Sequence, residues 1–280
     1  MKFRKIGIAY HPLNNEALSL AEELSAFLTA RGIVTWVCSA WEEVDLKAKA
    51  KESDLVLTTG GDGTILRVAQ AAIGLETPIT GINLGKLGFM TELEVKEVEE
   101  KLPALLEGEG WMDERAVLET RLTPANGDEE EIYYALNDAV VARGSIARII
   151  TIEVSIGGQP LTHYRADGLV VSTATGSTGY SMSAGGPVMY PGSHSMLLTP
   201  LMPHLSPSHC LVLEPSAEVK MKVTTTHEAT LCVDGHIHRP LKSGDIIDVK
   251  QSNERIRFLR LKPQEYFYRH LEQRLKGRTL

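Results

Sequence analysis

The sequence predicts two domains of different class: an N-terminal α/β domain with a parallel sheet and a C-terminal all-β, sandwich-like domain. Apolar, strand-like runs alternate with helix-like segments over the first 110 residues, as in parallel sheets covered by helices. From Val117 to about Leu261, short β-like runs and turn signals replace the helical period. The tail is helix-like again. We therefore expect domains at 1–112 and 113–262, and a final helix at 263–280 that docks on the N-terminal domain.

The first part of the chain alternates strand and helix in regular order. The clearest helix covers residues 15–32, because its apolar residues recur at helical spacing and Gly32 ends it. Its expected buried face comprises Ala17, Leu20, Ala21, Leu24 and Leu28. The expected strands are residues 5–10, 33–38, 54–59 and 78–83. The other expected helices are residues 41–52, 64–73 and 95–106.

The β domain is predicted from hairpin signals and short strands. Residues 117–142 are typical of a hairpin with Asn126-Gly127 in its loop, and residues 151–173 of strands that turn at Gly157-Gly158. Further strands are expected at 210–215, 218–224, 229–235 and 245–251. In the tail, apolar residues at i, i+4 and i+8 predict one helix face made of Phe267, Leu271 and Leu275.

Length, charge and cysteine content exclude several classes of protein. The 280 residues suffice for one large domain or two ordinary ones. A net charge of −7 argues against a nucleic-acid partner. Cys38, Cys210 and Cys232 form no CxxC pair, so neither a disulfide framework nor a local zinc site is expected. Because no signal peptide and no apolar run of about 20 residues is found, we expect a cytoplasmic protein without a membrane partner.

The stretch Gly60-Gly61-Asp62-Gly63-Thr64 lies where a strand becomes a helix. One interpretation is structural, with glycines in a tight turn and Asp62 capping the helix. The other is catalytic, because glycines let backbone N–H groups approach a ligand and a helix N-terminus favours phosphate. A carboxylate in a phosphate site repels the ligand unless it does chemistry or holds a metal. This favours an Asp62 that accepts a hydroxyl proton during phosphoryl transfer.

Other nucleotide-binding signatures are absent from the sequence. It has no GxxxxGK[ST] loop and no GxGxxG after the first strand. It also lacks the HRD and DFG motifs of protein kinases. A dehydrogenase is therefore disfavoured, as is a P-loop enzyme.

A second cluster, ADGLVVSTATGSTGYSMSAGGP, covers residues 166–187. Such a run of Ser, Thr and Gly could be a flexible loop. Against that, Asp167 lies near its start, Tyr180 lies inside it and Gly185-Gly186-Pro187 ends it. We interpret the cluster as a shaped backbone surface with many small hydrogen-bond donors.

GGDGT and DGLVVSTATGSTGYSMSAGGP together closely resemble the NAD kinase family, in order along almost the whole chain. The first motif is shared with phosphofructokinases and with diacylglycerol and sphingosine kinases, whereas the second is more specific. The resemblance implies transfer of the terminal phosphate of ATP, or of polyphosphate, to the adenosine-ribose 2′-hydroxyl of NAD, which gives NADP. It also implies an α/β domain, a β-sandwich-like domain and a returning final helix. Further matching segments are residues 83–93, 114–122, 136–144, 198–204 and 233–236.

The resemblance also implies roles for individual residues. Asp62 matches the general base, and Asn137 and Asp138 match an Asn–Glu pair that binds the dinucleotide, although Asp138 is one methylene shorter than Glu. Asp167 matches a position at the adenine end, and Gly179 in the NAD-wrapping loop replaces the usual Ala. The other expected nucleotide-binding residues are Gly60, Gly61, Gly63, Thr64, Arg67, Arg148, Arg165, Thr175, Ser177, Thr178, Tyr180, Ser181, Ser183, Asp234 and His236.

Some alternatives stay open on the sequence alone. A lipid or sugar kinase with the same GGDG motif, or a non-catalytic NAD(P)-binding regulator, would share one of the two motifs. Arg148 could be a solvated surface arginine. The resemblance implies a divalent cation, Mg²⁺ first, carried by the nucleotide and not by a protein metal site, and a homodimer or homotetramer. ATP against polyphosphate, and NAD against NADH, are not distinguished.

Overall fold

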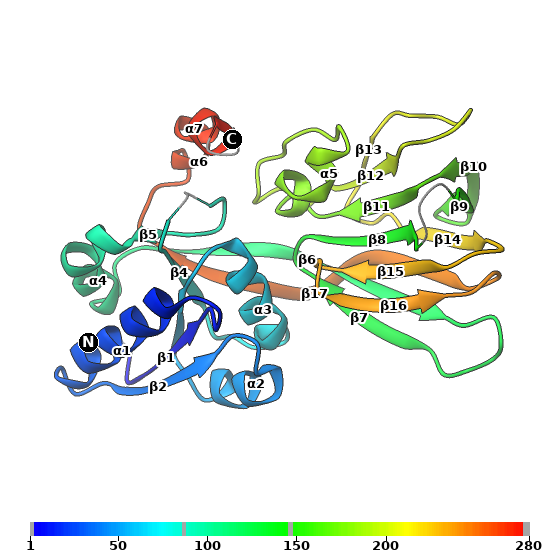
Figure 1. Ribbon diagram of the computed structural model, residues 1–280. Coiled ribbons are helices and arrows are strands. Elements are labelled where there is room, and N and C mark those ends of the chain that lie inside the picture. The colour runs from blue at the N-terminus through cyan, green and yellow to red at the C-terminus, as the bar shows by residue number, and fades with distance from the viewer. Residues whose placement is uncertain (1–2, 86–87, 145–147, 277–280) are drawn as a thin grey trace. The chain divides into compact units, whose positions relative to one another are not determined.

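The computed structural model describes residues 3–85, 88–144 and 148–276. The chain divides into two compact units, whose elements are labelled in Figure 1. The first unit consists of Met1–Glu114 and Ile256–Leu280, and the second unit of Arg115–Arg255. Two long strands, β6 (Trp111–Thr123) and β17 (Ile246–Arg260), have residues in both units.

The first unit is built on a parallel sheet with the strand order β2-β1-β3-β4. β5 pairs with β4, and Phe258 of β17 pairs with Ile79 of β4, also in parallel. Every residue of β3 and β4 is buried, as expected for strands covered on both faces. The strands are β1 (Lys5–Tyr10), β2 (Val34–Ser39), β3 (Leu55–Thr59), β4 (Ile79–Asn83) and β5 (Leu93–Glu94).

The helices of the first unit follow the predicted order. α1 (Asn15–Thr29) begins after Asn14, whose side chain accepts a hydrogen bond from the Glu16 backbone N–H and so caps the helix. The buried residues of α1 are the five that the sequence predicts, and Leu20, Ala21, Leu24 and Leu28 belong to the same core as the strand residues Ile6 and Ile8. The other helices are α2 (Glu43–Lys51), α3 (Asp62–Ala72), η1 (Val95–Glu97), α4 (Val98–Leu106), α6 (Tyr266–Arg269) and α7 (Leu271–Lys276).

The second unit is built mainly from antiparallel strands. One group has the order β10-β9-β14-β17, with β6 pairing β17 and β7, and the other has the order β13-β12-β11-β8-β15-β16. Apolar residues of both groups, such as Ile152, Val171 and Leu231, form one core. The strands first named here are β7 (Glu131–Ala135), β8 (Asp138–Arg143), β9 (Ile150–Ile156), β10 (Gln159–Ala166), β11 (Gly168–Ser172), β12 (Met196–Leu201), β13 (Leu211–Leu213), β14 (Val219–Thr224), β15 (Ala229–Val233) and β16 (Ile237–Leu241).

Both predicted hairpins are confirmed. β6 and β7 pair in antiparallel fashion with Leu118 opposite Ala135. β9 and β10 pair around the turn at Gly157-Gly158, where both glycines have positive φ. The predicted fold class, an α/β unit followed by a β-rich unit, is therefore confirmed.

Two segments differ from the sequence prediction. The tail forms two short helices, α6 and α7, which are separated at His270. Its aromatic residues are mediocre helix formers, and the Tyr266 ring stacks on the His270 ring at 3.9 Å between centroids. Within the Ser/Thr/Gly cluster, η2 (Gly176–Thr178) and α5 (Tyr180–Ser183) form short helical turns that no periodic pattern announces. Among the described residues, no helix combines the length and the apolar character that crossing a bilayer requires.

Candidate active site

The GGDGT loop joins the end of β3 to the start of α3 in the first unit. Gly61 is the N-cap residue in an extended conformation, and its carbonyl accepts from the Thr64 N–H at 3.0 Å. A Cβ at Gly60 would lie 2.3 Å from Thr64 Oγ1, so this position excludes a side chain. Gly61 and Gly63 are exposed, and a Cβ at either would meet nothing within 4 Å. The loop therefore presents open backbone at a helix N-terminus, where anions bind favourably.

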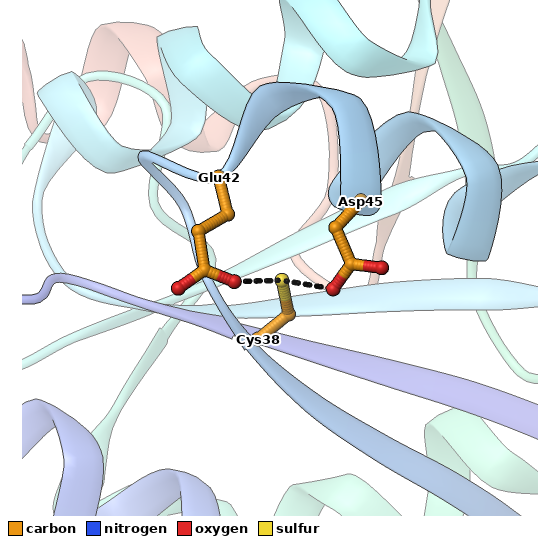
Figure 2. Close-up of side chains that lie close together, drawn as sticks. All are labelled: Cys38, Glu42 and Asp45. Carbon is orange, nitrogen blue, oxygen red and sulfur yellow. Dashed lines mark hydrogen bonds between the residues drawn. The ribbon is translucent and has the colours of Figure 1, made fainter.

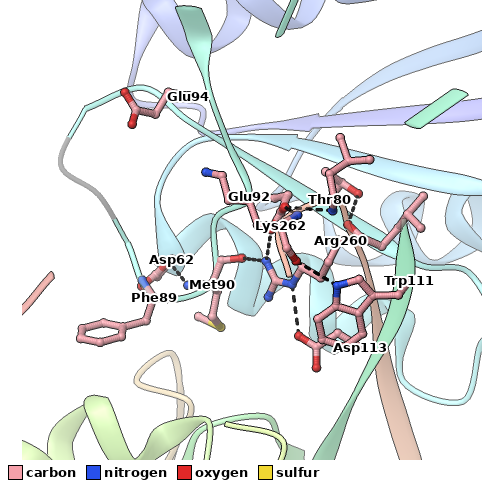
Figure 3. Close-up of polar contacts among 12 residues, drawn as sticks. Asp62, Thr80, Phe89, Met90, Glu92, Glu94, Trp111, Asp113, Arg260 and Lys262 are labelled. Carbon is pink, nitrogen blue, oxygen red and sulfur yellow. Dashed lines mark hydrogen bonds and ion pairs between the residues drawn. The ribbon is translucent and has the colours of Figure 1, made fainter. Parts of the chain in front are cut away.

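Asp62 is the first residue of α3 and lies half-buried. Its carboxylate accepts two backbone hydrogen bonds, from the Phe89 N–H at 2.8 Å and the Met90 N–H at 3.0 Å (Figure 3). The interpretation of Asp62 as the helix cap is wrong, because Gly61 occupies the N-cap and no side chain caps this helix. The carboxylate is instead oriented by a neighbouring backbone segment.

Gly88 is a site residue that sequence reasoning missed. A Cβ at this position would lie 2.3 Å from Asp62 Oδ1 and 3.0 Å from Asp62 Oδ2. Only glycine therefore lets the backbone at Phe89 and Met90 approach the carboxylate closely enough to donate. Gly88 belongs to the segment 83–93 of the family resemblance, but nothing in that segment alone connects it with Asp62.

The two remaining predicted residues of the first unit have different surroundings. Thr64 is buried, and its hydroxyl has no hydrogen-bond partner among the described residues. The Arg67 guanidinium lies over the Trp41 ring, 4.4 Å from its centroid, and the His11 ring contacts the same ring edge-on at 4.6 Å. Arg67 is thus held by an aromatic contact on the α3 side of the loop.

In the second unit, the Ser/Thr/Gly cluster folds against the start of β8. Thr173 connects the two, since its N–H donates to Asn137 O at 2.9 Å and its hydroxyl donates to Leu136 O at 2.6 Å. The same hydroxyl accepts from the Gly176 N–H at 3.0 Å. A Cβ at Gly176 would lie 2.1 Å from Asn137 O, so this approach also requires glycine. The cluster is therefore a folded segment bonded to the start of β8 and not a linker.

Asn137 and Asp138 form the polar centre of this surface. Asn137 Oδ1 is buried and has no hydrogen-bond partner among the described residues. Asp138 is 6% exposed. Burial first, and then the negative charge of Asp234, raise the pKa of Asp138 to about 7, while the Tyr180 backbone N–H acts in the opposite direction. An unpaired amide oxygen therefore lies next to a carboxyl group that is easily protonated.

Asp234 holds the backbone of this centre in place. It has positive φ in the turn between β15 and β16. Its carboxylate accepts from three successive backbone N–H groups, those of Leu136 at 2.8 Å, Asn137 at 2.7 Å and Asp138 at 3.2 Å. His236 Nδ1 lies 3.0 Å from Asp234 O in the same turn. The carboxylate of Asp234 thus acts on the site through the backbone.

The predicted hydroxyl residues divide into buried and exposed groups. Ser177 donates to Ala174 O and accepts from the Met189 N–H, so it fixes the loop. The Thr178 hydroxyl donates to Thr175 O at 3.3 Å. The Ser181 hydroxyl shares a hydrogen bond of 2.9 Å with the Thr199 hydroxyl. Thr175 Oγ1 accepts from Arg115, a further residue that sequence reasoning missed. Tyr180 and Ser183 are the exposed members of the group.

Three further charged residues predicted for the dinucleotide, Asp167, Arg165 and Arg148, have different settings. Asp167 forms a two-pronged ion pair with Arg143, at 2.7 Å from Nε and 3.0 Å from the guanidinium NH2. Arg143 was not among the predicted residues, although it lies in the matching segment 136–144. The side chains of Arg165 and Arg148 are exposed. Residues 145–147, which precede Arg148, lie outside the described residues.

A thiol and two carboxylates lie close together at the end of β2 and the start of α2 (Figure 2). Cys38 Sγ is 3.7 Å from Glu42 Oε2 and 3.5 Å from Asp45 Oδ2. Among the described residues, this is the one group of three His, Cys, Asp or Glu side chains arranged closely enough for a metal ion. Burial raises the pKa of the Cys38 thiol to about 12, and Lys49 already pairs with Asp45 at 2.6 Å. Because the thiol donates to both carboxylates and Lys49 pairs with Asp45, we interpret the group as hydrogen-bonded packing.

Comparison with known proteins gives consistent matches over nearly the whole chain. Residues 6–110 match a family model described as the ATP-NAD kinase N-terminal domain, and residues 136–261 one described as the ATP-NAD kinase C-terminal domain. An NAD kinase of Dehalococcoides mccartyi is 50% identical over 275 residues, which cover 98% of this chain and 97% of the relative. An NAD kinase of Chloroflexus aggregans is 38% identical, with 97% of this chain and 98% of the relative covered.

Two solved structures share the fold. The yeast NADH kinase complexed with NADH superposes with a TM-score of 0.88 at 22% identity, covering 99% of this chain and 88% of that chain. An NAD kinase from Archaeoglobus fulgidus in complex with ATP superposes with a TM-score of 0.75 at 23% identity, covering 98% of this chain and 99% of that chain. At this identity the superpositions establish the fold.

Proposed function

The chain belongs to the NAD kinase family, and we propose that it transfers the γ-phosphoryl group of ATP to the adenosine-ribose 2′-hydroxyl of NAD, forming NADP and ADP. The observation that carries this proposal is the setting of Asp62. A single carboxylate stands at the start of α3 between exposed glycines, and two backbone N–H groups orient it. An ionised carboxylate held in one orientation beside exposed backbone N–H groups suits a general base next to a phosphate site.

The proposed step is an in-line displacement at phosphorus. The 2′-oxygen of the ribose forms a bond to the γ-phosphorus while the bond from that phosphorus to the β–γ bridging oxygen breaks, and ADP leaves. Asp62 accepts the hydroxyl proton. The exposed backbone at Gly61 and Gly63, together with the N-terminus of α3, offers N–H groups to the phosphates.

The dinucleotide is proposed to bind in the second unit. Asn137 Oδ1 is a buried acceptor without a partner among the described residues, so a donor on the ligand would satisfy it. Beside it, Asp138 can donate or accept according to its protonation. The Tyr180 backbone N–H bonds to Asp138, and the exposed Tyr180 ring is proposed to offer an apolar face to the ligand. Asp234, Ser177 and Thr173 support the site by fixing its backbone.

The divalent cation is proposed to arrive with the nucleotide as Mg·ATP. Within the described residues, Asp62 belongs to no group of three side chains that could hold a metal ion. Mg²⁺ is commonly bound by phosphates and waters with only one or two carboxylates, which fits this setting. The assembly into a homodimer or homotetramer and the cytoplasmic location remain predictions. The assay below compares ATP with polyphosphate as the donor.

The proposal is tested with purified protein, NAD, ATP and Mg²⁺, with NADP measured by an NADP-specific dehydrogenase. Wild type is expected to form NADP, and Asp62→Asn is expected to keep the fold and NAD binding but lose about 10²- to 10⁴-fold in kcat, the usual value of general base catalysis. Near-normal turnover by Asp62→Asn would refute the role of the base. No NADP from wild type with either ATP or polyphosphate would favour a lipid or sugar acceptor or a binding-only role.

A further inference from the structure

The backbone segment Gly88–Met90, here called the clamp segment, is held on both sides. Its Phe89 and Met90 N–H groups donate to the Asp62 carboxylate at 2.8 and 3.0 Å. The carbonyl groups of the same two residues accept from arginines. Arg274 NH1 donates to Phe89 O at 3.4 Å, and Arg260 NH1 donates to Met90 O at 2.6 Å. All these residues belong to the first unit.

Arg260, at the end of β17, is fixed by a buried network (Figure 3). Its Nε donates to Asp113 at 3.1 Å, and its NH1 lies 3.4 Å from Glu92 Oε2. The other Glu92 oxygen accepts from the Leu261 and Lys262 backbone N–H groups at 2.9 and 2.7 Å. Because Glu92 and Asp113 are both buried and both interact with Arg260, they hold its guanidinium in one orientation, in which NH1 donates to Met90 O.

Arg274, in α7, is buried at 6% exposure without an ion-pair partner among the described residues. Its Nε is buried and makes no hydrogen bond there, and its guanidinium lies 5.8 Å from the Phe89 ring centroid and 5.6 Å from that of Tyr266. Burial and the positive charge of Arg260 lower the pKa of Arg274, whereas Tyr266, Asp62 and Glu92 favour its charged form. Burying a cation is costly, and here the nearby charges of Asp62 and Glu92, the two aromatic rings and the Phe89 carbonyl offset that cost.

We propose that Arg260 and Arg274 are positioning residues for phosphoryl transfer, which act through the clamp segment on Asp62. The inference rests on the proposed function. Arg274 holds the Phe89 carbonyl on one side, and because this carbonyl and the Met90 N–H belong to one planar peptide unit, the N–H is directed at the Asp62 carboxylate on the other side. Arg260 holds the next carbonyl, that of Met90, and so anchors the end of the clamp segment. A general base must lie within hydrogen-bond reach of the proton that it accepts. β17 and α7, which carry the two arginines, therefore help to set the position of the Asp62 carboxylate.

Arg274 is the residue to test, because Arg260 also supports the fold through Asp113 and Glu92. Arg274→Met keeps the length and removes the donors. We expect its kcat to fall about a hundredfold, the cost of a displaced catalytic group, while KM for NAD and ATP stays within about twofold. Arg274→Lys, which keeps a charge and one donor to Phe89 O, is expected to recover about tenfold of that loss. Arg269→Met is the matched control, since Arg269 is exposed and lies in the neighbouring α6.

A double mutant separates positioning from general loss of structure. If Arg274 acts through Asp62, adding Arg274→Met to Asp62→Asn lowers the residual kcat by less than about threefold, because the group it positions is gone. Assays are run below the thermal transition of each variant, and Arg274→Lys carries the test if Arg274→Met does not fold. An unchanged kcat in folded Arg274→Met, or the same loss in both backgrounds, would overturn the inference. Absence of NADP with wild type would instead overturn the proposed function.

Discussion

At the scale of single residues, the site is defined by close backbone approaches as much as by charged groups. Gly60, Gly88 and Gly176 each lie where a Cβ would approach another atom to 2.3 Å or less. Gly60 closes the turn onto Thr64, Gly88 admits the clamp segment to Asp62, and Gly176 admits the loop to Asn137. Each glycine thus fixes a distance that a side chain would lengthen.

Gly88→Ala is expected to separate the clamp segment from Asp62. The new Cβ would lie 2.3 Å from Asp62 Oδ1, so either the carboxylate or the backbone must move. We predict a fall in kcat of about ten- to a hundredfold with little change in stability. Gly85→Ala is the control, because a Cβ there would meet nothing within 4 Å. The prediction is checked by measuring the steady-state kinetics of Gly88→Ala and Gly85→Ala in parallel. Equal kcat values for the two variants would contradict it.

Asp138 is expected to make stability depend on pH. Its pKa is raised from 3.8 to about 7 in the folded protein. Between these values the unfolded chain binds fewer protons than the folded one, so this group lowers the free energy of unfolding as pH rises. This loss in the free energy of unfolding is absent below about pH 4 and complete above about pH 7.

Asp138→Asn removes this titration while keeping the shape of the side chain. Relative to wild type, the variant is expected to gain a few kcal/mol in the free energy of unfolding between pH 4 and pH 8, with no difference at the acid end. Urea unfolding of both proteins at four or more pH values gives the comparison. Parallel pH profiles would show that Asp138 titrates normally in the folded state.

At the scale of elements, short turns position residues that are distant in the sequence. The β15–β16 turn places the Asp234 carboxylate on three backbone N–H groups at the start of β8. Leu136 and Asn137 lie between β7 and β8, and buried N–H groups require an acceptor. The turn therefore organises Asn137 and Asp138 even though Asp234 is separated from them by 96 to 98 residues.

Asp234→Asn is expected to break this arrangement. An amide replaces one acceptor oxygen by an NH2 group, which faces a backbone donor. We predict a loss of about 2–3 kcal/mol in the free energy of unfolding, because the bonds lost are to a charged acceptor. KM for NAD should rise at the same time, since Asn137 shifts. Asp248→Asn, at a half-exposed aspartate of β17 paired with Lys220, is the control, and equal unfolding curves for the two variants would disprove the role.

At the scale of the whole molecule, the chain's end belongs with its beginning. Residues 256–280 form one unit with residues 1–114, while 115–255 form the other. The sequence suggested this return, because the tail is amphipathic after a long β-rich stretch. β17 makes it possible, since a single strand pairs in antiparallel fashion with β14 and in parallel with β4. The buried Arg260 and Arg274 thus come from elements that complete the first unit.

What the sequence determined by itself is local and periodic. The alternation of strands and helices, the buried face of α1 and the two hairpins follow from residue spacing, which short-range geometry fixes. The glycine–aspartate loop pointed to Asp62 as the proposed base, and the resemblance to the NAD kinase family pointed to Asn137 and Asp138 as dinucleotide-binding candidates. It failed in the tail and in the Ser/Thr/Gly cluster, where no period marks the short helices.

Only the tertiary structure decided which distant groups meet. Gly88 on Asp62, Arg143 on Asp167, Asp234 under β8 and the two arginines behind the clamp segment are contacts across 24 to 185 residues. No local sequence pattern predicts these contacts, because each one depends on how strands, helices and loops that are distant in the sequence pack together in the fold. The physical reason is burial: the folded chain removes these polar groups from water, and each must then find a partner that only the packed structure supplies.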